Sequence, residues 1–347
     1  MFFKLKKLSE LGVDVYLHCF EYGRGKQKEL LRYCKKVHYY KRNTSFQHLV
    51  SMTPYIVKTR SSNTLIANLL KDDHPILFEG LHTTAAMLHH DFGSRIVMVR
   101  PHNIEHNYYK GLSKSEAGKR KKLFFKTESQ KLKKYEAILH KATYILSISP
   151  FEHQYFENNY GNKTIYTPVF FDNNFSRLNE PKKKFSLWHG DLNVVDNQKA
   201  VLFIINVFSK LKEFPLIIAS NAMNKEILKE VAKHQNITYD KLEKQDDLEK
   251  LFQTAHIHPL VTYQKTGIKL KLLNALTKGK FVVANSLMIE DTGLESLCHN
   301  ANTLNQFRKI ISKLMHETFE EEERTKRKVV LENFNGELSA KKIIDLL

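Results

Sequence analysis

Apolar residues along this chain follow two recurring patterns. Short continuous apolar runs, such as residues 75–78 and 281–284, alternate with longer segments in which apolar residues recur at the spacing of helix turns, such as residues 62–70. Short runs are typical of buried strands, and helical spacing is typical of a helix with one buried face. Their alternation predicts an α/β fold built on parallel sheets.

Each half of the chain contains its own series of such segments. In the first half the pattern predicts strands over 13–20, 75–78, 95–99 and 144–149, and helices over 2–11, 62–70, 83–90 and 114–134, with another after Pro150. In the second half it predicts strands over 185–189, 215–219, 237–239, 257–260 and 281–284, alternating with helices that include 200–209, 225–233 and 248–254. Three further helices are expected over 302–317, 321–332 and 338–347.

The alternation stops in residues 169–184, where proline, asparagine and a lysine run replace it. Such a composition is typical of an interdomain linker. We therefore predict an N-terminal domain over residues 1–168 and a C-terminal domain over residues 185–330, followed by a last helix within residues 331–347. A chain of 347 residues is long enough for two domains with separate cores.

The composition is that of a folded globular chain, with 42% hydrophobic and 27% charged residues. Cys19, Cys34 and Cys298 are far apart and form no Cys-x-x-Cys pair. The cysteines therefore indicate neither a disulfide framework nor a thiolate zinc site, and a reducing cytosol is the simplest compartment. No apolar run approaches the ~18 residues of a membrane-spanning helix, and the first residues predict an amphipathic helix rather than a signal peptide.

The net charge of +18 is large enough to attract anionic partners. Its densest source is the predicted helix over 114–134, in which nine basic residues face only Glu116 and Glu128 as acidic residues. Two interpretations are open: a solvated helix face, or a face that binds the anionic inner surface of a bacterial membrane. Nucleic acid is the less favoured partner, because no helix-turn-helix, zinc finger or aromatic RNA-binding motif accompanies the charge.

The most informative segment is residues 266–285, which predicts a glycine turn, a helix ended by Gly279, and a strand. An apolar run at 256–260 precedes it. Ligands of open parallel sheets bind beyond the carboxyl ends of the strands, where helix N-termini present free N–H groups and a partial positive charge. Lys269 and Lys271 add full charges near the start of this helix. The segment predicts a diphosphate site, and the alternative is a structural turn with two solvated lysines.

The same residues resemble a known family. The pattern Gly-x-Lys-x-Lys-x-x-x-Ala-Leu at 267–276, followed by Gly-Lys-x-Val-Val at 279–283, is similar to the donor-binding segment of retaining glycosyltransferases of group 1 or family 4. This resemblance implies the GT-B fold: α/β, with two Rossmann-like domains facing a cleft and the C-terminal helix packed on the N-terminal domain. It also implies a UDP- or GDP-sugar donor, with no metal or other cofactor.

The resemblance also assigns donor-binding residues. Gly190, after the first strand of the second domain, is expected to let the backbone approach the donor, and Lys199 lies near the position of a diphosphate-binding lysine of relatives. An exposed helix lysine is the commoner explanation of Lys199. The residues that match the family's donor segment are Thr266, Gly267, Ile268, Lys269 and Asn274. Thr266 and Asn274 stand where relatives usually carry glutamates, and Asn274 can hydrogen-bond a ribose without being a charged acceptor.

Polar residues follow two predicted strands of the first domain. In relatives a histidine in the loop after the second of these strands faces the reacting sugar, and His102 is the matching position. We expect His102 and Glu105 to be catalytic, with Glu105 orienting an acceptor hydroxyl. Glu79, His82 and Asn103 are expected on the acceptor side.

Two alternatives use the same loop. Its polar groups can simply cap the next helix. The spacing of His102, Glu105 and His106 also matches His-x-x-Glu-His, the inverted zinc-protease pattern, which requires all three residues inside one regular helix.

Relative to this family the chain begins one strand late. A strand and a glycine-rich loop usually precede the helix that here begins at Phe2, and the short sequence Gly23-Arg24-Gly25 is too weak a glycine pattern to replace them. Either the start is truncated relative to relatives, or an atypical sheet fills the gap.

The predicted function is transfer of a sugar, with retention, from a nucleotide diphosphate sugar to a glycan or lipid-linked saccharide in bacterial surface polysaccharide synthesis. The protein is expected in the cytoplasm, and at the inner face of the membrane if the basic helix binds lipid. Two alternatives are a noncatalytic carbohydrate- or partner-binding protein with the same fold, and a zinc hydrolase that uses His102, Glu105 and His106.

Overall fold

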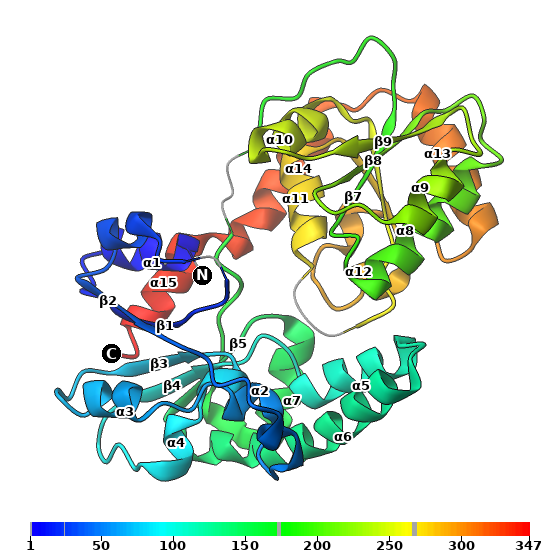
Figure 1. The fold of residues 1–347 in the computed structure, drawn as a ribbon. Helices are drawn as coiled ribbons and strands as arrows, with labels where there is room; N and C mark the ends of the chain where they lie inside the picture. Colours follow the sequence, from blue (N-terminus) through cyan, green and yellow to red (C-terminus); the bar gives the residue numbers. More distant parts are fainter. Residues whose placement is uncertain (1, 24, 172–174, 266–268) are drawn as a thin grey trace. The chain divides into compact units, whose positions relative to one another are not determined.

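The computed structural model describes residues 2–23, 25–171, 175–265 and 269–347, which form two compact units (Figure 1). The first unit combines the described residues up to 171 with the C-terminal residues 333–347, and the second holds the described residues between 175 and 332. Every strand ladder among the described residues is parallel. The predicted α/β class with parallel sheets is therefore confirmed in both units.

The strands of the first unit form two separate sheets. A four-stranded sheet pairs, in this order, β3 (Ile76–Glu79), β4 (Val97–Arg100), β5 (Tyr144–Ser147) and β6 (Thr164–Tyr166). Strands β1 (Tyr16–Phe20) and β2 (Lys36–Tyr40) pair with each other and with no other described strand. The interpretation that a first strand is absent relative to the family stays a prediction.

Helices surround these sheets. The helices of the first unit are α1 (Phe2–Glu10), α2 (Tyr55–Lys58), α3 (Asn63–Leu69), α4 (Ala86–His89), α5 (Glu105–Ser115), α6 (Lys119–Tyr135), α7 (Pro150–Tyr160) and α15 (Gly336–Ile344). Side-chain caps start several of them: the Ser62 hydroxyl accepts the Leu65 N–H at the start of α3, and Ser149 precedes α7 with Pro150 at its first position.

The central strand β4 shows how the first unit buries both faces of its larger sheet. Successive side chains of a strand point to opposite faces. Val97 and Val99 accordingly pack in one apolar cluster with Leu132 of α6, whereas Met98 packs in another with Leu8 of α1. The alternation explains why the whole strand is buried and why its sequence is almost continuously apolar.

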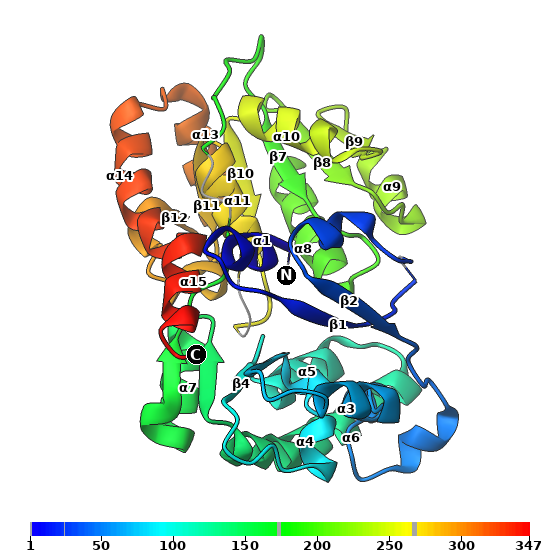
Figure 2. The same ribbon diagram turned by 90° about the vertical axis from the view of Figure 1, so that its left-hand side faces the viewer.

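The C-terminal helix α15 belongs to this first unit. Figures 1 and 2 show it beside α1, and Ala340 and Ile343 share the apolar cluster of Leu8. Phe171 forms a parallel bridge with Asn335, just before the helix. The last residues of the chain are therefore part of the core of the first unit.

Helices α5 and α6 form a hairpin that extends from the first unit (Figure 1). The Ser113 hydroxyl donates to the Lys122 carbonyl, and the Ser129 hydroxyl donates to the His106 carbonyl, which ties the two helices together. The prediction of a single basic helix over 114–134 was wrong at its start, because residues 116–118 interrupt the helix and Lys114 lies in the last turn of α5.

The second unit contains one six-stranded parallel sheet. Its strands are β7 (Ser186–His189), β8 (Leu216–Ser220), β9 (Ile237–Lys241), β10 (Ile257–Leu260), β11 (Phe281–Ala284) and β12 (His299–Asn300). Their order in the sheet is β12-β11-β10-β7-β8-β9. The chain thus winds outward from β7 to β9, returns to the middle at β10, and winds outward in the other direction.

The helices of the second unit cover this sheet. They are α8 (Val195–Phe208), α9 (Lys225–Val231), α10 (Gln245–Thr254), α11 (Leu270–Lys278), α12 (Ser286–Ile289), α13 (Leu304–His316) and α14 (Glu321–Leu331). One apolar cluster joins the sheet to α8 and α13, with Trp188, Phe208 and Phe307 among its largest buried side chains.

Several predicted boundaries shift in the structure. Strand β1 begins at Tyr16 rather than at residue 13, after a turn at Gly12, which has a φ of +86°. The helix expected over 83–90 is reduced to α4, because a 3-10 turn at Leu81–Thr83 precedes it. Strands β2, β6 and β12 were not predicted. Among the described residues, none of the helices has both the length and the apolar character that crossing a membrane requires.

Candidate functional site

The donor segment of the second unit lies at the point where the sheet order reverses. The two neighbouring strands at this point are β7 and β10. In open parallel sheets, ligands bind beyond the carboxyl ends of the strands at such a reversal. Gly190 follows β7 directly. Helix α11 follows the loop after β10, and the first N–H groups of a helix have no carbonyl partner within the helix.

Lys271, in the first turn of α11, reaches across to β7. Its Nζ lies 4.9 Å from the centre of the Trp188 ring and 2.7 Å from Oδ1 of Asn197. A Cβ at position 190 would lie 2.6 Å from this Nζ. A side chain at 190 would therefore require the Lys271 side chain, or the Trp188 ring at 2.9 Å, to shift.

The charge of Lys271 is not balanced by a nearby acid. Burial lowers the pKa of Lys271 to about 8, and the more distant Asp191 opposes this shift only in part. Its hydrogen-bond partner Asn197 is a neutral amide, and within the described part of the chain Lys271 forms no ion pair. Burying a cation without a counter-charge costs free energy, so an anion bound here would be stabilised.

Lys269 stands at the N-cap of α11 rather than inside its first turn, which is one position earlier than expected. Its Nζ donates to the Gln264 carbonyl at 2.7 Å, and the Gln264 side chain in turn donates to Asp196 of α8 at 2.5 Å. Lys269 therefore helps to hold the loop after β10 against α8.

The other donor candidates occupy different environments. The Asn274 amide donates to the Leu270 carbonyl of its own helix at 2.9 Å. Lys199 is exposed on α8. Thr266, Gly267 and Ile268 lie outside the described residues. The structure thus brings Gly190 together with Lys271, one of the two lysines that the sequence places at the predicted diphosphate site. The contact of its Nζ with β7 was not predicted.

In the first unit, a cluster of buried charges lies at the carboxyl ends of β3 and β4. Glu79 forms an ion pair with Lys4 of α1, and its other oxygen lies 3.0 Å from Nε2 of His102 and 3.9 Å from Nη1 of Arg100. Lys4 and Arg100 are only 3% and 5% exposed. Burial would raise the pKa of Glu79, but Lys4, the hydrogen bond from His102 and Arg100 hold it well below its ordinary value.

The cluster holds the His102 ring in place. One ring nitrogen faces Glu79, while the side chain keeps 38% of its surface exposed. His82 lies beside it, with ring centres 6.0 Å apart. Burial, with the charges of Arg60 and His102, lowers the pKa of His82 to about 3, so this ring is neutral at pH 7. Gly80, with a φ of +85°, leaves room for the His82 ring.

Glu105 begins α5 and is buried, with 6% exposure. Burial raises the pKa of this carboxyl to about 7, although Arg60 and a hydrogen bond from Asn103 oppose the shift. A group with this pKa exchanges a proton easily near neutral pH. The first unit thus brings Glu79, His82 and His102 into contact, and Asn103 hydrogen-bonds Glu105.

The arrangement weighs against the zinc hydrolase alternative. His102 precedes α5, so the pattern is not inside one helix. His102 bonds Glu79, whereas Nδ1 of His106 lies 3.3 Å from a different carboxylate, that of Glu136. Over the ranges that the structure describes, no three His, Cys, Asp or Glu side chains are grouped so that they could hold a metal ion.

Comparison with known proteins relates part of the second unit to a family. Residues 183–317 match the family model described as glycosyl transferases group 1. Over this segment the chain is similar to this glycosyltransferase family. It is 26% identical, over 321 residues, to a 44.6 kDa protein of the cps region of Klebsiella pneumoniae, an alignment that covers 84% of this chain and 79% of that protein.

Solved structures with the same fold cover nearly the whole of this chain. Sucrose-phosphate synthase from Thermosynechococcus elongatus superposes with a TM-score of 0.71 at 13% identity, covering 99% of this chain and 90% of that chain. A glycosyltransferase from Rickettsia africae gives 0.68 at 14% identity, with 99% and 92% coverage. HepE of Anabaena, solved with UDP and glucose, gives 0.66 at 12% identity, with 99% and 94% coverage. The predicted GT-B fold, with two Rossmann-like units of parallel sheet, is confirmed.

Proposed function

We propose that this protein moves a sugar, with retention, from a UDP- or GDP-sugar to a glycan or lipid-linked saccharide. The observation that carries the donor half is Lys271, a partly buried ammonium beside Gly190 with a neutral hydrogen-bond partner and no ion pair among the described residues. A diphosphate supplies the anion that this position lacks. HepE, a structural neighbour, was solved with UDP and glucose, which supports a nucleotide donor.

In this proposal each donor residue has a distinct task. Lys271 binds the diphosphate, and Gly190 leaves space for both the lysine and the donor. Lys269 and the N–H groups at the start of α11 stabilise the departing diphosphate. Asn274 turns from its helix carbonyl to the ribose. Thr266, Gly267 and Ile268 stay predicted donor contacts.

The first unit supplies the groups for the transferred sugar and the acceptor. We propose that His102 hydrogen-bonds the sugar, held by Glu79, and that Glu105 orients the acceptor hydroxyl and accepts its proton. His82 and Asn103 line the acceptor side. Lys4 and Arg100 keep Glu79 ionised, so that it remains an acceptor for the His102 N–H.

The relative from a cps region supports a role in surface polysaccharide synthesis. The outer side of α6 supports a location at the cytoplasmic face of a membrane, because its basic residues Lys121, Lys122, Lys126 and Lys133 are exposed together with Leu123. Such a surface suits anionic lipid headgroups.

Calorimetric titration of UDP and GDP, followed by an assay of donor turnover, tests this function. We expect the parent protein to bind one nucleotide and Lys269→Ala to bind it more weakly, roughly tenfold to a hundredfold, because a hydrogen bond to a charged group is lost. Lys229→Ala is the matched control, since Lys229 is exposed on α9 and has no proposed donor role. Absence of binding to the parent would contradict the donor assignment.

A noncatalytic protein with the same fold is the second candidate. The observation that favours it is Asn274, which stands in place of a glutamate and bonds its own helix instead of projecting away from it. Nucleotide binding without turnover of any nucleotide sugar, in the presence of a saccharide acceptor panel, would favour this candidate.

A further inference from the structure

A separate cavity of about 450 Å³ lies in the first unit, at the carboxyl ends of β1 and β2. Its lining residues are Glu21, Tyr22, Gly23, Lys41, Arg42 and Thr44. Ligands of parallel sheets bind at this end of the strands, and the volume lies within the range of small-molecule sites. Neither the donor residues nor the His102 cluster belong to this lining.

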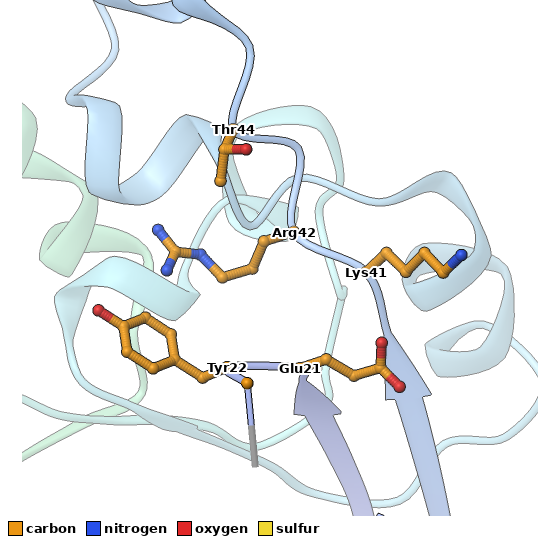
Figure 3. Close-up of a pocket in the computed structure, with 6 residues that line it drawn as sticks. Glu21, Tyr22, Lys41, Arg42 and Thr44 are labelled. Atoms are coloured by element: carbon orange, nitrogen blue, oxygen red, sulfur yellow. The ribbon is translucent and has the colours of Figure 1, made fainter. Parts of the chain in front are cut away.

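Figure 3 shows two sides of this cavity. The Arg42 guanidinium and the Tyr22 ring extend to one side, and the Glu21 and Lys41 side chains extend to the other. Two cations and one carboxylate leave the lining with an excess of positive charge. Tyr22 is 70% exposed, so most of its ring is available for contact.

Arg42 is held in position before any ligand binds. Its Nη2 donates to Oγ1 of the fully buried Thr59 at 3.3 Å, and its guanidinium lies 4.8 Å from the centre of the Tyr22 ring. The Asn43 N–H donates to the Thr59 carbonyl at 3.1 Å, which anchors the same loop. The Nε of Arg42 is buried and has no hydrogen-bond partner among the described residues.

A second arginine increases the local positive charge. Arg60 lies near enough to Arg42 for their charges to repel, and both lower the pKa of His82. An anion at Arg42 would relieve this repulsion. A planar guanidinium fork matches a carboxylate or a phosphate, and the exposed tyrosine ring offers an apolar face for a sugar ring.

We propose that this cavity binds an acidic saccharide, with its anionic group on Arg42 and its ring against Tyr22. The proposal rests on the proposed function in one respect: it assigns the cavity to the acceptor, which would then be a glycan with a carboxylate or phosphate group. The charges of Arg42 and Arg60 act on His82, which places this site next to the residues proposed to meet the acceptor.

Saturation-transfer NMR, with affinities from competition, tests the proposal on the full chain. The probes are glucuronic acid, glucose 6-phosphate, neutral glucose and inorganic phosphate. We expect one or both acidic sugars to bind, and glucose to bind at least about tenfold more weakly, because the charge-assisted hydrogen bond is missing. A preference between the first two probes distinguishes a carboxylate from a phosphate.

Variants connect the binding to the cavity. Arg42→Gln should weaken binding of the acidic sugar roughly tenfold to a hundredfold, and Tyr22→Ala should weaken it less. Arg42→Lys keeps the charge but loses the planar guanidinium that can donate two parallel hydrogen bonds. Its loss of affinity should therefore lie between those of Tyr22→Ala and Arg42→Gln. Arg120→Gln, at an exposed position of α6, is the matched control. Unchanged thermal unfolding checks that each variant folds.

Three results would overturn the proposal: glucose binding as well as the acidic sugars, inorganic phosphate binding as well as the acidic sugars, or Arg42→Gln binding like the parent protein. Titration with UDP separates this failure from failure of the proposed function. If Arg42→Gln loses the sugar and UDP does not bind the parent, the cavity assignment stands and the donor function fails. If UDP binds and no acidic sugar does, the reverse holds.

Discussion

Positive charges withdrawn from solvent have different partners in the two units. In the first unit Lys4 and Arg100 surround the carboxylate of Glu79, and their charges are matched by it and by backbone carbonyls that accept from Arg100. In the second unit Lys271 is partly buried but bonds a neutral amide. The first arrangement is complete without a ligand, whereas the second lacks an anion.

This difference separates structural from ligand-binding cations. A buried charge that is already paired is costly to disturb, because its partner is left buried and uncompensated. A buried charge without a counter-ion destabilises the free protein slightly and is stabilised when an anion binds. Substitutions in the two clusters should therefore act on different properties, stability in the first and ligand affinity in the second.

The largest expected effect is that of Glu79→Gln, which leaves Lys4 and Arg100 without their carboxylate. We expect the free energy of unfolding to fall by about 3–5 kcal/mol. Denaturant unfolding followed by circular dichroism measures it, and Glu249→Gln is the control, since the half-exposed pair of Glu249 with Lys278 should contribute less than about 1 kcal/mol. Equal losses of stability in Glu79→Gln and Glu249→Gln would contradict the distinction between buried paired charges and a partly exposed ion pair.

A third group of cations, on the outside of α6, extends the comparison to exposed charge. Replacing Lys121, Lys122, Lys126 and Lys133 with glutamine should weaken binding to anionic vesicles by several kcal/mol at low salt, at about 1 kcal/mol for each charge, and less at high salt. Stability should hardly change, because these side chains are exposed. Vesicle sedimentation measures the binding, and equal sedimentation of parent and variant would contradict a membrane role.

Lys271→Met is the direct counterpart of the Glu79 substitution. We expect affinity for the nucleoside diphosphate to fall roughly tenfold to a hundredfold, since a charge-assisted hydrogen bond is lost. The free protein should keep its stability or gain some, because an uncompensated buried cation is removed. Calorimetry and thermal unfolding give the two values. A large loss of stability with unchanged affinity would make Lys271 a structural residue.

The pH dependence of nucleotide binding also tests the charge of Lys271, and its expected effect is smaller. The cationic form of Lys271 is present below its pKa of about 8 and is lost as the pH rises through that value. Affinity for UDP should therefore decline above pH 8, by up to about tenfold for one pH unit, whereas an ordinary lysine with a pKa near 10.4 would show no such decline. Lys271→Arg should abolish the decline. A flat profile in the parent would show that Lys271 does not contact the nucleotide.

The smallest expected effect concerns Asn274. Asn274→Ala should weaken nucleotide binding by less than Lys269→Ala, because a neutral hydrogen bond contributes about 1 kcal/mol. Asn274→Glu should hold or raise affinity if the ribose contact is made. Calorimetric comparison of UDP with free diphosphate isolates the ribose contribution, and identical losses for both ligands would place Asn274 outside the ribose site.

The sequence predicted the elements whose patterns are local. Strands such as β11 and helices such as α3 and α13 were recognised within about two residues, because a buried strand or a capped amphipathic helix depends on neighbours in the chain. Strand β2 was not recognised. Its first residue is exposed, its middle three are partly buried and Tyr40 is buried, so the run lacks a clear alternation of apolar and polar residues.

Within the candidate site, the sequence singled out Gly190 and the lysines of the α11 motif, because glycine and paired lysines near a helix start are local signals. It could not show that the Nζ of Lys271, eighty-one residues later, occupies the space at Gly190. Nor could it show that Lys4 pairs with Glu79, because the two residues are 75 positions apart in the chain.

The amino-acid sequence by itself determined the alternation of strands and helices, the two-unit division of the pattern and the donor motif, since each depends on residues close together in the chain. Only the tertiary structure decided which charges are paired, which cation lacks a partner and which side chains line a cavity. These properties arise when the carboxyl ends of parallel strands bring distant loops together, and burial then sets the pKa of each group according to the neighbours it meets there.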